Sequence, residues 1–140
     1  MAINVKNPKG LPVLKWFAKS TDIKKGQLVK SDTGASPVAA AHTGQTILGI
    51  TLEAQAAANG VVYFYPINGQ VLEIDFVKTG TKKSFAVTDL GTQYDMVVTS
   101  GNQVLDPDDT TGGFLILVDY NNDASKAYVV IDAADLLLSA

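Results

Sequence analysis

The hydrophobic positions of this chain recur mostly at the spacing of β-strands. Residues 71–77 alternate apolar and acidic side chains, which predicts a strand with one buried face and with Glu73 and Asp75 on the other. Residues 46–52 are almost continuously apolar, which predicts a strand buried on both faces. Similar short runs that end in turn residues predict strands at 27–31, 61–65, 84–88, 96–99, 103–105, 114–118 and 127–131.

Signals for α-helix are weak. Residues 53–60 contain good helix formers but are too few for a stable helix, so we expect a loop or one to two turns there. Residues 135–138 could form a C-terminal turn that buries leucines. Val, Ile and Thr make up a quarter of the chain, and the acidic residues are 12 Asp and only 2 Glu, which favours strands and polar loops over helices. The pattern therefore predicts an all-β protein, a compact barrel or sandwich.

The 140 residues are enough for one domain. Prolines and a glycine interrupt residues 1–19, so this segment is predicted to be an extended N-terminal arm that can be removed without unfolding the rest. Residues 20–140 are predicted to form a single all-β domain.

The domain repeats itself at a spacing of about 67 residues. Residues 47–50 match 114–117, and residues 61–63 match 128–130, with a glycine turn ahead of each pair. Pseudo-repeats at about 20–67 and 87–133 predict two related halves that share one core.

The residue inventory excludes most chemistry. There is no Cys, no Arg and a single His, His42, so thiolate sites and two-histidine metal sites within one chain are excluded. All 11 basic residues are Lys, which argues against nucleic-acid recognition, and no apolar run approaches the roughly 18 residues of a membrane span. We expect no cofactor, no nucleic acid and no membrane as a partner.

Charge is concentrated at the N-terminus, where residues 1–30 hold seven Lys and one Asp while the rest of the chain is acidic. One interpretation is a solvated lysine face with the only tryptophan in the core. The other is a basic arm that docks on an acidic partner, because aromatic residues are enriched at interfaces. The candidate contact residues are Lys6, Lys9, Lys15, Trp16, Phe17 and Lys19.

Three patterns are candidates for chemical sites. The acidic residues at 106–112 and 119–123 lack the glycine and glutamate of an EF-hand loop, so Asx turns are expected, although a looser carboxylate cage across loops stays open. His42 lacks a Gly-x-Ser-x-Gly partner motif, and Glu73 with Asp75 fits a solvent face better than an acid–base pair. We therefore assign no catalytic residue and no metal ligand, and expect that the protein is not an enzyme.

The chain resembles the capsid decoration, or cement, proteins of tailed phages, which share a β-tulip-type fold. The resemblance is carried by the order of short motifs over residues 23–131, and residues 1–19 lie outside it. In the second copy, residues 114–117 lack the glycine of the first, and residues 124–126 replace its Ala–Gly loop. The motifs of the first copy are Lys25-Gly26-Gln27-Leu28-Val29, Gly34 to Val38, Ile47-Leu48-Gly49-Ile50 with Glu53-Ala54, and Asn59-Gly60-Val61-Val62.

This resemblance implies a non-catalytic structural protein of the virion, assembled in the host cytoplasm. Such proteins bind the outside of an icosahedral capsid, often as homotrimers, and bridge subunits of the major capsid protein. Two alternatives are a surface module that binds carbohydrate through exposed Tyr63, Tyr65 or Tyr94, and a small hydrolase that uses His42.

Overall fold

The computed structural model describes residues 3–5, 14–17, 26–31, 35–37, 47–51, 61–67 and 69–135. Within these ranges the protein is all-β, with two short 3₁₀ turns and no α-helix. The strands are β1 (Asn4–Val5), β2 (Leu14–Phe17), β3 (Leu28–Ser31), β4 (Ala35–Pro37), β5 (Ile47–Thr51), β6 (Val61–Pro66), β7 (Leu72–Asp75), β8 (Gln93–Thr99), β9 (Asn102–Asp106), β10 (Leu115–Asn121) and β11 (Lys126–Ile131), and the turns are η1 (Val87–Asp89) and η2 (Ala133–Asp135).

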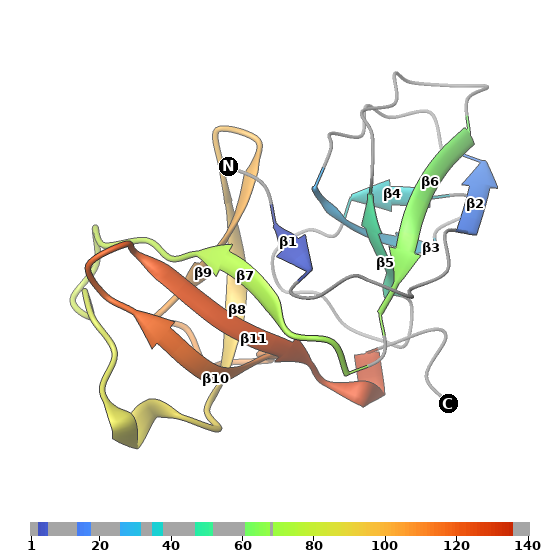
Figure 1. The fold of residues 1–140 in the computed structure, drawn as a ribbon. Coiled ribbons are helices and arrows are strands. Elements are labelled where there is room, and N and C mark those ends of the chain that lie inside the picture. The colour runs from blue at the N-terminus through green and yellow to red at the C-terminus, as the bar shows by residue number, and fades with distance from the viewer. Residues whose placement is uncertain are drawn as a thin grey trace.

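The strands form two antiparallel sheets (Figure 1). One sheet has the order β1-β7-β11-β10-β8-β9, and the other has the order β2-β6-β5-β3-β4. A parallel bridge between Phe76 and Leu105, with a hydrogen bond from Val77 N–H to the Leu105 carbonyl at 3.1 Å, links β7 to β9. The predicted all-β class, a compact sandwich, is confirmed.

The two sheets repeat one topology, since β2, β6, β5, β3 and β4 follow the same order as β7, β11, β10, β8 and β9. Gly26 and Gly91 both have positive φ, +72° and +87°. Gly26 N–H donates to the Thr51 carbonyl at 3.0 Å, and Gly91 N–H donates to the Leu117 carbonyl at 2.8 Å. Leu117 therefore corresponds to Thr51 and not to Ile50, so the predicted sequence alignment is out of register by one residue here.

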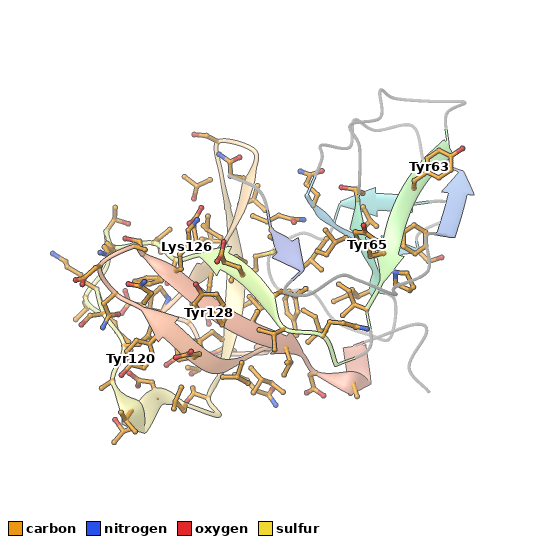
Figure 2. The ribbon with its side chains drawn as sticks, viewed as in Figure 1. Tyr63, Tyr65, Tyr120, Lys126 and Tyr128 are labelled. Carbon is orange, nitrogen blue, oxygen red and sulfur yellow. The ribbon has the colours of Figure 1, made fainter. Side chains whose placement is uncertain are left out.

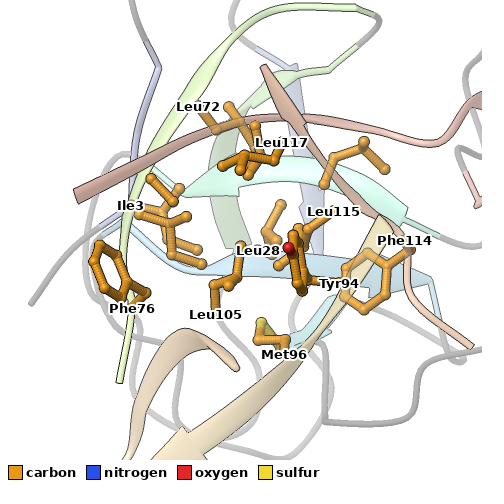
Figure 3. Packing of buried hydrophobic residues seen from close by; sticks show 14 of the residues in the cluster. Ile3, Leu28, Leu72, Phe76, Tyr94, Met96, Leu105, Phe114, Leu115 and Leu117 are labelled. Atoms are coloured by element: carbon orange, nitrogen blue, oxygen red, sulfur yellow. The ribbon is translucent and has the colours of Figure 1, made fainter. Parts of the chain in front are cut away.

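The core is one cluster to which both sheets contribute (Figure 3). Leu28 of β3, fully buried, lies in the same cluster as Leu105 and Leu115 of the other sheet. Edge-to-face contacts join the Phe85 ring to the rings of Phe76 and Tyr94, with centroids 4.7 Å and 5.4 Å apart. Burial of the apolar side chains of this cluster, which come from both sheets, is the main force that holds the sheets together.

Gln103 of β9 adds a polar link between the sheets. Its side-chain Oε1 accepts the Leu28 N–H at 2.7 Å, and its Nε2 donates to the Leu28 carbonyl at 3.0 Å. The amide therefore pairs with β3 as the backbone of a neighbouring strand would, and it satisfies two buried polar groups.

Most predicted strands are present. The alternation at 71–77 gives a strand whose buried residues include Leu72 and Ile74, and the strand around 46–52 is buried on both faces. The predicted strand at 84–88 is wrong, because this segment is a loop that ends in η1. Phe85 is buried there by long-range contacts: the Asn122 side chain accepts the Phe85 N–H and donates to its carbonyl, each at 2.9 Å.

Two parts of the predicted N-terminal arm are strands. β1 pairs with β7 through Asn4 and Val5, and β2 pairs with β6. Ile3 is 3% exposed and donates its N–H to the Gly26 carbonyl at 2.8 Å. The part of the segment around Ile3 and β1 therefore packs on the sheet, and that the rest stays folded when residues 1–19 are removed stays a prediction. Residues 53–60 and 136–138 lie outside the described residues.

Candidate functional site

The predicted contact segment lies at the edge of the five-stranded sheet. Lys15, Trp16 and Phe17 belong to β2, the first strand in the order of that sheet (Figure 1). Among the described strands, β2 pairs only with β6, in a register that sets Lys15 opposite Tyr63. Lys6, Lys9 and Lys19 lie outside the described residues, so the structure does not test whether they join this edge.

Two tyrosines lie along the strand next to β2. Tyr63 is 40% exposed and Tyr65 is half-buried, and as residues i and i+2 of β6 they share one face (Figure 2). Tyr94, the third tyrosine of the predicted sugar platform, is only 2% exposed and belongs to the core. The prediction that Tyr94 is an exposed platform is therefore wrong, whereas Tyr63 and Tyr65 lie on one face of β6 as a platform requires.

The opposite side of the molecule carries cross-strand polar pairs. Glu73 lies opposite Tyr128, and Asp75 lies opposite Lys126 with an ion pair between their side chains. Lys126 and Tyr128 are labelled in Figure 2. A hydrogen bond to Glu73 raises the pKa of Tyr128, and the hydrogen bond to Asp75 raises the pKa of Lys126. Glu73 and Asp75 thus have separate partners on the outer face and are not arranged as an acid–base pair.

The acidic loop after β9 uses its carboxylates to hold its own backbone. Asp106 Oδ1 accepts the N–H of Asp108 at 3.0 Å, and Asp109 Oδ1 accepts the N–H of Thr111 at 2.9 Å. These are the Asx turns predicted from the sequence. Nowhere in the described ranges do three or more acidic, His or Cys side chains gather as a metal cage.

A second loop, residues 76–92, packs against the acidic one. Asp108 Oδ1 accepts the Lys82 N–H at 2.8 Å, and the Lys82 ammonium lies 2.9 Å from Asp89. The Ala86 N–H and then Lys82 hold the pKa of Asp89 below its ordinary value, and Asp89 in turn raises the pKa of Lys82. The hydrogen bond from Lys82 N–H to the Asp108 carboxylate joins the two loops, while the Lys82–Asp89 ion pair lies within the 76–92 loop.

Apolar side chains are exposed beside these loops. Val87 is 74% exposed and Leu90 is 42% exposed, and Val118 of β10 is 41% exposed. The hydrogen bond from Gly91 N–H to the Leu117 carbonyl brings the backbone at Leu90 close to the backbone at Val118. The sequence pattern missed this patch, because it placed Val87 inside a strand.

Comparisons with known proteins leave the family open. No protein-family model matches the chain, and no curated protein matches it either. Along the part of the chain that the structure describes, no helix is long and apolar enough to cross a membrane. His42, the residue of the hydrolase alternative, lies outside the described ranges.

Proposed function

We propose that this protein is a structural protein of a tailed-phage virion that decorates the outside of the capsid and acts by adhesion, without catalysis. Its partner in this proposal is the major capsid protein, whose neighbouring subunits it bridges. The sequence resemblance to decoration proteins and the all-β sandwich support the proposal together.

The observation that carries the proposal most is the position of β2. Its sequence, Leu-Lys-Trp-Phe, combines a positive charge with two aromatic residues, and it forms the outer strand of the five-stranded sheet among the described strands. Edge strands are sites where another protein chain can pair, and aromatic and basic residues suit the centre and rim of an interface.

The acidic groups of the described loops also fit an adhesive protein. Asp106, Asp108, Asp109 and Asp89 each accept backbone N–H groups and so hold loop shape. Interfaces depend on such preorganised surfaces, because ordering a loop on binding costs affinity. A homotrimer would add the contacts of three copies, which raises avidity through effective concentration.

The proposal is tested by sedimentation of the purified protein with assembled capsid shells. The wild-type protein is expected to pellet with the shells and to saturate. Lys15→Glu is expected to weaken apparent binding at least about tenfold, since it reverses the charge of the contact segment. Lys83→Glu, the same change on an exposed lysine of the 76–92 loop, is the matched control and is expected to bind as wild type.

A carbohydrate-binding module is the second candidate, favoured by the shared face of Tyr63 and Tyr65. Aromatic rings on a flat face can stack on sugar rings. A glycan array distinguishes the two functions: retention of a glycan that is lost in Tyr63→Ala, together with no binding to shells, would support this candidate and contradict capsid decoration.

A further inference from the structure

The two repeated sheets differ in strand number at one edge. In the six-stranded sheet β1 lies beside β7, while the five-stranded sheet begins with β2, the strand that corresponds to β7 (Figure 1). Within the described residues, β2 pairs with β6 and with no strand on its other side. The described part of the repeat therefore leaves a strand position open beside β2, at the place that β1 takes beside β7.

The strand registers show which residues of the two sheets are equivalent. Thr51 and Leu117 are equivalent, because the carbonyl of each accepts the N–H of an equivalent glycine. Thr51 lies opposite Phe64, and Leu117 lies opposite Val129. Phe64 of β6 and Val129 of β11 are therefore equivalent, and both are fully buried.

Lys15 of β2 takes the position that Glu73 has on β7. Tyr63 and Tyr128 directly precede the buried equivalent pair of β6 and β11, so they are equivalent too. Tyr63 lies opposite Lys15, and Tyr128 lies opposite Glu73. On its other side, Glu73 lies opposite Asn4 of β1. A strand that fills the open position would therefore place one residue directly opposite Lys15.

The sequence of β2 sets the chemistry that this strand must have. β1 is antiparallel to β7 and places Val5 opposite Leu72, whose equivalent on β2 is Leu14. An apolar residue therefore suits the position opposite Leu14. Opposite charges that face each other across two strands stabilise the pair, and like charges destabilise it, so an acidic residue suits the position opposite Lys15.

The described edge strands of a second copy do not fit this position. Two copies of β2 would bring like charges together, and lysine on an edge strand discourages edge-to-edge pairing. β4 contains a proline and no acidic residue, and β1 has no acidic residue. β9 does contain Asp106, but the Leu105 carbonyl beside it already accepts the Val77 N–H. The occupant that fits is a segment of another protein.

We propose that an extended acidic segment of another protein completes the five-stranded sheet, by pairing antiparallel with β2 and placing a carboxylate opposite Lys15. Backbone hydrogen bonds would supply affinity, and the residue pairs at Leu14 and Lys15 would supply selectivity. The inference deepens the proposed function, and it rests on that function only for the assignment of the segment to the major capsid protein.

A synthetic peptide tests this edge without capsid shells. In the peptide valine alternates with glutamate, so that its carboxylates share one face, and it is titrated into the isotope-labelled full chain. Binding is expected to shift the backbone amide resonances of residues 14–17. The same peptide methylated at every backbone nitrogen cannot donate hydrogen bonds to β2 and is expected not to bind.

Charge reversal tests the position opposite Lys15. The wild-type protein is expected to bind the glutamate peptide at least about fivefold more tightly than a peptide with lysine in place of glutamate. Lys15→Glu is expected to reverse this preference, and its binding of the lysine peptide also shows that the variant is folded. Lys83→Glu, at an exposed lysine of the 76–92 loop, is expected to keep the wild-type preference.

The proposal is overturned if the glutamate peptide does not bind, if the methylated peptide binds equally well, or if Lys15→Glu keeps the wild-type preference. It is also overturned if amide hydrogen exchange at residues 14–17 slows with protein concentration alone, because a second copy would then occupy the edge.

Hydrogen exchange on capsid shells separates this inference from the proposed function. Slower exchange at residues 14–17 on shells supports both. Shells that bind the protein without slowing exchange there overturn strand pairing and leave capsid decoration standing. Shells that do not bind, together with the expected peptide selectivity, contradict capsid decoration and support the acceptor edge.

Discussion

The side chain of Gln103 offers the sharpest test of how the two sheets are held together. It is 5% exposed, and it satisfies both the N–H and the carbonyl of Leu28, a residue with no exposed surface. Gln103→Leu keeps nearly the same volume but removes both hydrogen bonds. The N–H and carbonyl of Leu28 would then be buried without partners.

Each buried polar group without a partner costs about 1–3 kcal/mol, so the loss of two partners should cost about 2–6 kcal/mol of unfolding free energy. The unfolding entropy of a 140-residue chain is about 0.3 kcal/mol/K, which converts this loss to a fall of about 7–20 °C in melting temperature. The size of the effect depends on the burial of Leu28 and not on the contacts of Gln103 alone.

Urea and thermal unfolding followed by circular dichroism measure this difference. Gln93→Leu is the matched control: Gln93 is an exposed residue of β8, and its replacement should change stability by less than about 0.5 kcal/mol. If Gln103→Leu is as stable as the Gln93 variant, the amide does not hold the sheets together and the reasoning fails.

Three further predictions concern the loops and turns. Phe85→Ala should cost about 3–5 kcal/mol in urea unfolding, because it empties the centre of an aromatic cluster, and a loss under 1 kcal/mol would show that the loop does not fill the core. Asp89→Asn should lower stability at neutral pH. The Ala86 N–H and then Lys82 hold the pKa of Asp89 below its ordinary value in the folded protein, so this difference should be fully present above that ordinary value and close as the pH falls through the folded pKa; a difference that is the same at all pH values contradicts the stabilisation of the Asp89 carboxylate by these two partners. Gly49→Ala should cost about 3 kcal/mol or more, since an added Cβ would lie 1.9 Å from the carbonyl oxygen of the neighbouring strand, whereas Gly69→Ala should cost only about 1–2 kcal/mol of backbone strain; equal losses by thermal melting would refute the steric argument.

Local sequence pattern was sufficient to predict the strands with regular burial. The alternation over residues 71–77 marks a strand with one buried face, and the continuous apolar run over 46–52 marks a strand buried on both faces. The turn at Ser100 and Gly101 was also predictable, and both residues have positive φ, +51° and +77°. The repeat could be found in order, although the predicted alignment is one residue out of register at Leu117.

Long-range contacts explain what the sequence did not reveal. Phe85 reads as part of a strand, yet it is a loop residue held by Asn122, 37 positions away. β1 is two residues long and gains its stability from β7, so no local period marks it. Asp95 lies outside the predicted strand at 96–99 but inside β8, and its pairing with Asp106 is set by the register of the β8–β9 hairpin.

The direct test of the proposed function is a density map of capsid shells incubated with the purified protein. The proposal predicts additional density on the outer surface of the shell, in contact with more than one major capsid subunit, with β2 at the contact. Shells that remain bare at saturating protein, or density that contacts the shell without the β2 edge while Lys15→Glu binds as wild type, would contradict it.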